Sequence, residues 1–210
     1  TFTSMPSTPN LAPYSMLRSI TLTLLFVFLG LGAAESSAQV TRFQVLKADE
    51  LVGHVIAMRM PTATGTVYTM TSHCELDIVW TQVVRSSLRA EYTDGLLTSC
   101  HTSLRVNDSV RDSSSMSKGA DQCFVHPDAA FACERNTQWT TSRLYFEEPV
   151  GQSLIFVESV LKDCPLVPSG PNRYTLTFPN RNVNHYIYKD GVLQEIHVER
   201  TLMDLVFRRA

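Results

Sequence analysis

The chain has 210 residues, of which 44% are hydrophobic, and its formal net charge is −2. This length and composition fit one globular domain that can build a core. The near-neutral charge offers no basic surface for a phosphate backbone, so we expect no nucleic-acid partner.

An apolar run near the amino terminus has the order of a secretory signal peptide. Residues 16–18 give a short basic start, residues 20–31 are mainly apolar, and small residues follow up to Ala38. A membrane span needs about 20 apolar residues, and this run is shorter. We therefore predict a signal peptide over residues 16–38 that is cleaved after Ala38. The polar, proline-bearing residues 1–15 are interpreted as a disordered, over-extended start.

The signal predicts that the remaining part of the chain, residues 39–210, is exported to the periplasm or secreted. Because the predicted signal is removed, we expect no transmembrane anchor in this mature part. An exported chain meets an oxidising compartment, in which disulfides persist.

Alternation of apolar and polar residues dominates the mature part. From residue 76 to residue 92 most even positions are apolar and most odd positions are polar, which is typical of a half-buried strand. Residues 96–106 continue the pattern after a turn that contains Gly95. A three-residue loop would pair Leu88 with Cys100 and put both apolar faces on one side. A two-residue turn would pair even with odd positions, so we favour the longer loop.

The same loop type is expected before Gly191, where it would align Tyr186 and Tyr188 with the even positions from 192 to 198. Residues 107–122 are polar and are predicted to form a mobile loop. Other segments rich in β-branched and aromatic residues predict strands at 51–60, 66–73, 139–146, 153–158, 173–178 and 201–208.

About ten short strands favour an all-β fold, in which a single antiparallel meander over residues 39–210 curls into a barrel or roll. Curling is expected because large open sheets leave edges that aggregate. Six aromatic residues are expected to pack in the core or across strands: Trp80, Tyr92, Tyr145, Phe146, Tyr186 and Tyr188.

Five cysteines lie in the predicted mature part, so they cannot all pair within one chain. A hairpin centred on Asp128 would place Cys123 opposite Cys133, which makes these two our candidate disulfide. The alternative is that they are free thiols packed as small hydrophobic side chains.

Two dipeptides, His73-Cys74 and Cys100-His101, have the chemistry of zinc ligands. Neighbours on a strand point to opposite faces, so each dipeptide offers only one ligand to a given side. If the strand runs straight, Cys74 lies about 45 Å from the residue that faces Cys100. We therefore predict no metal or other cofactor, and no disulfide between Cys74 and Cys100.

Signals of catalysis are weak. The segment Gly151-Gln152-Ser153 supplies only the first half of a nucleophile elbow, and a turn that enters a strand is the simpler interpretation. Glu147 and Glu148 are expected to diverge as sequence neighbours, whereas an acid–base pair must converge. No catalytic residue is predicted.

Three segments resemble a family of exported bacterial proteins that is known only as a domain of unknown function: LYFEEP at 144–149, IFVE at 155–158 and NHYIYKDGVL at 184–193. The resemblance covers most of the chain from residue 53 to residue 207. It implies an all-β exported domain, and a more distant similarity to periplasmic β-roll proteins implies a curled antiparallel sheet. It brings no catalytic residues, and the cysteines depart from the family pattern, which leaves the disulfide open.

Three functions follow from these observations. The first is a non-enzymatic exported β domain that binds a hydrophobic or amphipathic small molecule, a lipid or an envelope partner on its concave side, because a curled sheet must fill its interior. The second is an envelope structural protein that associates through its edges and an unpaired cysteine, for which Cys164 is the candidate. The third is an exported hydrolase whose site residues are distant in sequence. The oligomeric state stays open.

Overall fold

The computed structural model describes residue 1 and residues 37–77, 80–119, 122–126, 129–131, 136–200 and 203–210. The chain divides into two units, Thr1–Ser36 and Ser37–Ala210, and the second contains the folded domain. The predicted signal peptide and the predicted disordered start lie almost entirely outside the described residues, so both stay predictions.

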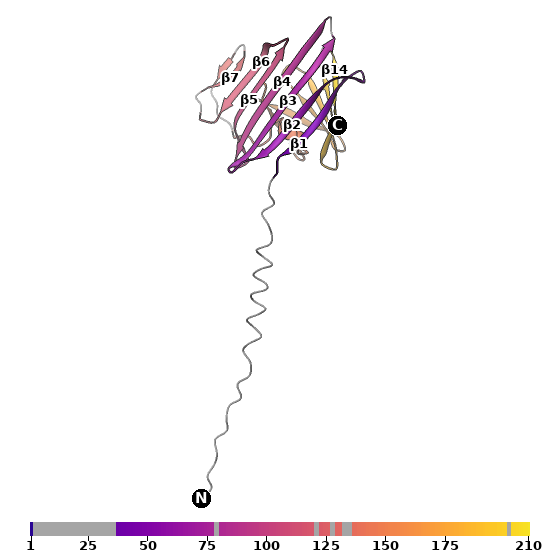
Figure 1. Cartoon of the computed structure of the whole chain (residues 1–210). Coiled ribbons are helices and arrows are strands. Elements are labelled where there is room, and N and C mark those ends of the chain that lie inside the picture. The colour runs from indigo at the N-terminus through magenta and orange to yellow at the C-terminus, as the bar shows by residue number, and fades with distance from the viewer. Residues whose placement is uncertain (2–36, 78–79, 120–121, 127–128, 132–135, 201–202) are drawn as a thin grey trace. The chain divides into compact units, whose positions relative to one another are not determined.

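All strands of the described domain join in one sheet (Figure 1). They are β1 (Gln39–Lys47), β2 (Glu50–Pro61), β3 (Gly65–Asp77), β4 (Thr81–Thr93), β5 (Leu96–Val106), β6 (Ser109–Ser117), β7 (Cys123–His126), β8 (Ala129–Phe131), β9 (Leu154–Val157), β10 (Lys162–Gly170), β11 (Arg173–Thr177), β12 (Val183–Lys189), β13 (Val192–Glu199) and β14 (Asp204–Arg209). The order β8-β7-β6-β5-β4-β3-β2-β1-β14-β13-β12-β11-β10-β9 is that of two meanders joined where β1 pairs with β14. Every neighbouring pair of strands is antiparallel, which confirms the predicted all-β meander.

The sheet curls so that its two ends approach each other. Phe156 on β9 packs in a buried cluster with residues of β3 to β7, and Ser114 on β6 donates a hydrogen bond of 2.6 Å to the carbonyl of Glu158. Residues 137–141 bridge the remaining gap. Leu97 N–H bonds to the Thr137 carbonyl at 2.8 Å, and Phe156 N–H bonds to the Trp139 carbonyl at 3.0 Å. The predicted curl into a barrel or roll is therefore confirmed.

Four hairpins are built in one way, with a two-residue turn followed by a bulge. The turns are Ala48-Asp49, Asp94-Gly95, Asn107-Asp108 and Asp190-Gly191, and all eight residues have positive φ. Such turns suit the right-handed twist of paired strands. In each hairpin two residue pairs follow the turn, and the pairing register then shifts by one residue.

The sequence prediction of three-residue loops was wrong, because the hairpins have two-residue turns and a bulge instead. Thr93 pairs with Leu96 across a two-residue turn, and Leu88 pairs with Thr102 instead of Cys100. The extra residue at the bulge restores even-with-even pairing, because it moves every later side chain to the opposite face. The two apolar faces therefore still share one side.

The bulge of the β12–β13 hairpin has the same effect. Tyr188 pairs with Leu193, and Tyr186 pairs with Ile196. Leu193 is buried, whereas Val192, the predicted partner of Tyr188, is 42% exposed.

Residues 76–92 form parts of two strands instead of one. β3 ends at Asp77 and β4 begins at Thr81, so the chain reverses near Trp80. Its position at this turn leaves Trp80 65% exposed, and its predicted place in the core was wrong. Tyr92, Tyr145, Tyr186 and Tyr188 are buried as predicted, and Phe146 is half-buried.

Two further segments differ from their predictions. The polar residues 109–117 form β6 and are not a loop, because β5 and β7 hold them on both sides and buried Ser114 bonds to Thr102 at 2.7 Å. Residues 139–146 contain one 3-10 turn, Arg143–Tyr145, in place of the expected strand. Gly151 has positive φ and precedes β9, which confirms the turn predicted there. No helix in the described part has the length and apolar character that crossing a bilayer requires.

Candidate functional site

A cavity of about 520 Å3 lies inside the curled sheet. One wall comes from β3 to β7, and the other comes from β9 and β12 to β14 with the connections that follow β9, β11 and β13. Apolar side chains from both walls line it: Met70, Leu88, Val157, Val160, Phe178 and Phe207. The volume falls within the range of about 300–1,000 Å3 that is usual for ligand sites.

The connection between β8 and β9 supplies part of the cavity lining. Thr141 and Tyr145 of this connection line it, and Tyr145 and neighbouring Leu144 are buried. The Tyr188 hydroxyl donates a hydrogen bond of 2.7 Å to the Leu144 carbonyl. We call residues 137–148 the plug, because they fill the interior between the two meanders.

A fully buried carboxylate holds the plug in place. The carboxylate of Glu158, just after β9, accepts hydrogen bonds from the backbone N–H of Thr141 at 3.1 Å and of Ser142 at 3.0 Å. It also accepts the Thr141 hydroxyl. Hydrogen bonds to a charged acceptor are among the stronger ones, so Glu158 fixes the residues that close the cavity.

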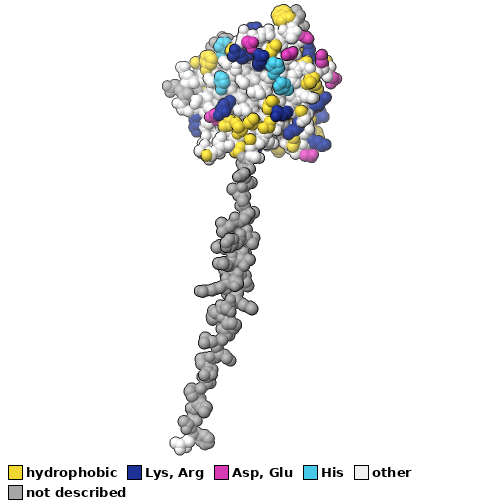
Figure 2. Space-filling model, in the orientation of Figure 1, with side chains coloured by type: hydrophobic (Ala, Val, Ile, Leu, Met, Phe, Trp, Pro, Cys, Tyr) yellow, Lys and Arg dark blue, Asp and Glu magenta, His cyan; other side chains and the backbone are white. Residues whose placement is uncertain are grey.

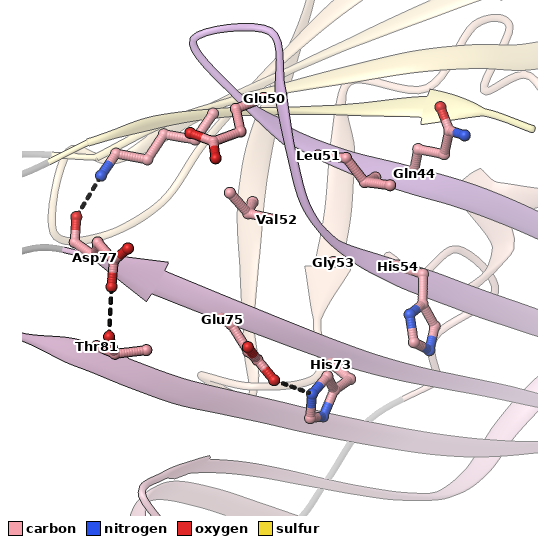
Figure 3. Close-up of a pocket in the computed structure, with 11 residues that line it drawn as sticks. Gln44, Glu50, Leu51, Val52, Gly53, His54, His73, Glu75, Asp77 and Thr81 are labelled. Atoms are coloured by element: carbon pink, nitrogen blue, oxygen red, sulfur yellow. Dashed lines mark hydrogen bonds and ion pairs between the residues drawn. The ribbon is translucent and has the colours of Figure 1, made fainter.

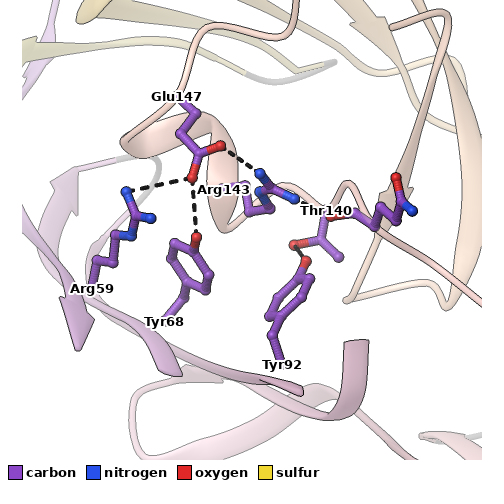
Figure 4. Close-up of polar contacts among 7 residues, drawn as sticks. Arg59, Tyr68, Tyr92, Thr140, Arg143 and Glu147 are labelled. Carbon is purple, nitrogen blue, oxygen red and sulfur yellow. Dashed lines mark hydrogen bonds and ion pairs between the residues drawn. The ribbon is translucent and has the colours of Figure 1, made fainter. Parts of the chain in front are cut away.

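A second set of contacts ties the plug to β2, β3 and β4 (Figure 4). The Glu147 carboxylate accepts a hydrogen bond from the Tyr68 hydroxyl at 3.2 Å and pairs with Arg143 and, at 3.5 Å, with Arg59. Burial, followed by the nearby Glu147 charge, raises the pKa of Tyr68, so the phenol stays protonated and donates. The Tyr92 hydroxyl bonds to Thr140 at 2.8 Å.

Glu148 turns the other way and accepts a hydrogen bond of 2.9 Å from the Tyr174 hydroxyl. The divergence predicted for Glu147 and Glu148 is confirmed. Both carboxylates belong to the plug and bind it to tyrosines of the wall, and neither lines the cavity.

Polar side chains gather at one end of the cavity. Asn180 and Asn182 come from the β11–β12 connection, and Arg200 comes directly after β13. The pairing of Val183 with Glu199 brings these two connections side by side. The cavity thus has an apolar body and a polar end.

A second hollow, of about 630 Å3, lies on the outer face of β1 to β4 (Figure 3). Several of its polar groups bond to one another. Lys47 donates to the Asp77 carbonyl at 2.6 Å, Thr81 donates to the Asp77 carboxylate at 2.6 Å, and His73 lies 3.6 Å from Glu75. This face of the domain exposes basic (Lys or Arg) and histidine side chains, with patches of hydrophobic side chains among them (Figure 2). The interior cavity is the better candidate, because apolar side chains from both walls line it, whereas most side chains that line the outer hollow are polar or charged.

Comparison with known proteins places the sequence in a family. Residues 43–210 match the family described as Domain of unknown function (DUF6134). The chain belongs to this family. Among curated proteins, none matches the sequence.

The DUF6134 domain also resembles a solved structure, the crystal structure of a beta-barrel-like protein of domain of unknown function DUF1849 from Brucella abortus. The TM-score is 0.53 and the identity is 10%, over 85% of this chain and 98% of that chain. At this identity the likeness shows the fold alone. An uncharacterised family with an all-β, barrel-like fold is what the sequence resemblance implied.

One polar row on the outer face of the DUF6134 domain was not foreseen. The His185 ring bonds through Nδ1 to the Thr175 hydroxyl at 3.0 Å and through Nε2 to Glu199 at 3.0 Å. Hydroxyl, imidazole and carboxylate are the groups of a nucleophile, base and orienting acid. The row faces solvent, however, and none of its three residues lines the cavity. Only the correct register of β11, β12 and β13 would have revealed it.

The structure places the candidate disulfide only in part. Cys123 on β7 is buried, and the register of the β7–β8 hairpin sets it opposite Phe131 instead of Cys133. Cys133 lies outside the described residues, so the Cys123–Cys133 disulfide stays a prediction.

The three cysteines that the structure describes as free, Cys74, Cys100 and Cys164, are all buried. Burial raises the pKa of Cys74 to about 11 and that of Cys100 to about 12. The straight-strand distance predicted for Cys74 was wrong, because the chain reverses after β3 and Cys74 pairs with Val84. Within the described ranges no three His, Cys, Asp or Glu side chains converge as metal ligands.

Proposed function

We propose that the DUF6134 domain is an exported, non-enzymatic binding protein that holds an amphipathic ligand in its interior cavity. The observation that carries this proposal is the hollow of about 520 Å3 between the two meanders, which has an apolar body and one polar end. Apolar walls favour a hydrocarbon ligand because they remove its surface from water, at about 25 cal/mol for each Å2 buried.

The hydrogen bonds that hold the surroundings of the cavity also support binding. Glu158, Glu147 and Tyr188 fix the plug to three different parts of the wall. A cavity that is already formed spends less free energy on ordering when a ligand enters. Export is supported by the signal-like order of residues 16–38.

A dye-binding titration tests this proposal. The probe is N-phenylnaphthylamine, a neutral apolar dye whose fluorescence rises in apolar sites. Ser86 bonds to Ser72 at 2.6 Å, contacts Met70 and lines the cavity, so Ser86→Phe should occupy part of its space. We expect wild type to bind one dye and Ser86→Phe to bind it at least about tenfold more weakly, a loss of about 1.4 kcal/mol.

The matched control is Ser117→Phe, at an exposed position of β6 that does not line the cavity. This variant should bind the dye as wild type does. Circular dichroism confirms that each variant is folded. Absence of saturable binding, or equal binding by Ser86→Phe and wild type, contradicts the proposal.

A second function, association with an envelope partner, is favoured by one surface. Leu154 on β9 and Val167 on β10 are 55% and 56% exposed, and Pro165, which pairs with Leu154, is also exposed. Apolar side chains on the outer face near a sheet edge are typical of contact surfaces. Chemical crosslinking in envelope extracts tests this function, since Leu154→Asp should lose a crosslinked product that wild type forms. Identical products from the two proteins would count against this function. Association through a disulfide of Cys164 would require the core to open, because this thiol is 1% exposed.

A further inference from the structure

Arg200 is a cation in the cavity wall whose charge has no carboxylate partner among the described residues. Its Nη1 donates to two backbone carbonyls, that of Glu199 at 2.7 Å and that of Val183 at 3.2 Å. Its guanidinium lies over the ring of Phe178, 5.2 Å from the centroid. The carbonyls and the ring orient the guanidinium but carry no full negative charge, and the Asp204 carboxylate accepts a hydrogen bond from the Arg200 backbone N–H at 3.4 Å without an ion pair to the guanidinium.

The surroundings of Arg200 make this charge costly. The side chain is half-buried, and burial lowers the pKa of Arg200 because the charged form is partly removed from water. Asp112 on β6 also lines the cavity, but it is exposed and does not pair with Arg200. A partly desolvated cation is stabilised by an anion that approaches it in low dielectric.

A second polar group with unused hydrogen-bonding capacity lies in the same wall. The Asn184 amide bonds to the Tyr186 hydroxyl at 3.4 Å through Nδ2, and its Oδ1 is buried without a partner. The opposite assignment of the amide would let the Tyr186 hydroxyl donate to Oδ1 and would leave Nδ2 unpaired as a donor. An anion accepts hydrogen bonds, so it can pair with the Asn184 amide only in the second assignment, and because the unpartnered atom is buried in the wall the Asn184 side chain must turn to make that contact.

We propose that the ligand of the cavity carries an anionic headgroup, a carboxylate or a phosphate monoester, which accepts hydrogen bonds from Arg200 beside Asn184 while its hydrocarbon chain fills the apolar body. This inference rests on the proposed function and specifies the class of its ligand. Guanidinium groups suit both headgroups, since two parallel N–H donors match two oxygens. Asn180 and Asn182 add amides at the same end.

Displacement of the bound dye by amphiphiles with one chain length tests the inference. The probes are dodecanoate, dodecyl phosphate, dodecanol and dodecyltrimethylammonium, each below its micelle concentration. We expect at least one of the two anions to displace the dye at a concentration at least about tenfold lower than dodecanol does, which corresponds to about 1.4 kcal/mol. Comparison of dodecanoate with dodecyl phosphate then separates the two headgroups.

Two variants test whether Arg200 causes the preference for anionic amphiphiles. Arg200→Gln should still bind the dye but should lose the preference for anions over dodecanol, and Arg200→Lys should keep part of it. Arg181→Gln is the control, because Arg181 is an exposed arginine in the neighbouring β11–β12 connection and does not line the cavity. It should behave as wild type.

The outcomes separate the two proposals. Dye binding with no preference for anions, or with a preference that survives in Arg200→Gln, overturns the anionic headgroup and leaves the binding function standing. Absence of dye binding by wild type overturns both.

Discussion

Glu158 shows how much one side chain decides in this domain. Its carboxylate is fully buried, and its partners are the backbone N–H groups of Thr141 and Ser142 and the Thr141 hydroxyl. A buried carboxylate is tolerated only when such donors surround it. In the sequence, Glu158 follows an apolar strand as an ordinary polar residue, and nothing local marks it as buried.

Glu158→Gln should lower the free energy of unfolding by about 1–3 kcal/mol. Glutamine keeps the shape but replaces one of two acceptor oxygens by a donor, which then faces a backbone N–H. Urea unfolding measures the change. Glu50→Gln, at an exposed position of β2, is the control and should alter stability by less than about 0.5 kcal/mol. Equal stability of Glu158→Gln and wild type would show that these hydrogen bonds do not hold the plug.

At the scale of elements, the hairpins depend on glycine for two different reasons. Gly191 lies in a turn at φ +75° with open space around its Cα, so a side chain there meets only backbone strain. Gly65 begins β3, and a Cβ added there would lie 1.8 Å from the carbonyl oxygen of Tyr92. Replacement of Gly65 therefore forces the paired strands apart.

Gly191→Ala should destabilise the domain by about 1 kcal/mol, because alanine rarely adopts positive φ. Gly65→Ala should cost more, about 2–3 kcal/mol, because backbone must move. Gly191→Asn should recover most of the loss, since asparagine tolerates the left-handed region. Thermal unfolding of the three variants measures the order of their stabilities. A larger loss for Gly191→Ala than for Gly65→Ala would contradict this account of the turns.

At the scale of the whole molecule, two buried clusters form one core. The first lies mainly between β1 to β3 and β9 to β14, and the second lies mainly between β3 and β7. Met70 and Phe146 pack against both clusters. Because the clusters share these side chains and the plug, we expect them to unfold together.

The free thiols report on this cooperativity. Cys74 and Cys164 lie in the first cluster, and Cys100 lies in the second. At pH 8 a thiol whose pKa is raised to about 11, as in Cys74, is almost entirely protonated and unreactive. We expect all three thiols to resist iodoacetamide in native protein and to become reactive at the same urea concentration. Mass spectrometry of the labelled peptides measures the extent of reaction at each cysteine. Labelling of Cys100 well before Cys74 and Cys164 would show that the second cluster opens alone.

The fold class was predictable because alternation is a local property. Even and odd positions of β4 and β5 carry different side chains, and this alone predicts a half-buried antiparallel sheet. The hairpin turns were also visible in Asp94-Gly95 and Asp190-Gly191. Their bulges were not, because a bulge is selected by the fit of two strands and leaves no residue type of its own.

The interior of the domain was not predictable from the sequence. The plug contacts walls that are far away in the chain: Glu147 bonds to Tyr68, 79 residues away, and the Leu144 carbonyl bonds to Tyr188, 44 residues away. The serine-rich strand β6 was interpreted as a loop for the same reason, since only its pairing partners and the Thr102–Ser114 bond make it a strand.

The sequence by itself determined an all-β antiparallel domain, its principal turns and the side of the sheet that is apolar, since each depends on neighbours along the chain. Only the tertiary structure decided where the cavity lies, which carboxylate is buried and which cation faces the interior. Those features arise where β3 to β7 meet β9 to β14 across the curl. Contacts of this kind depend on the register of many strands at once, and no local pattern encodes them.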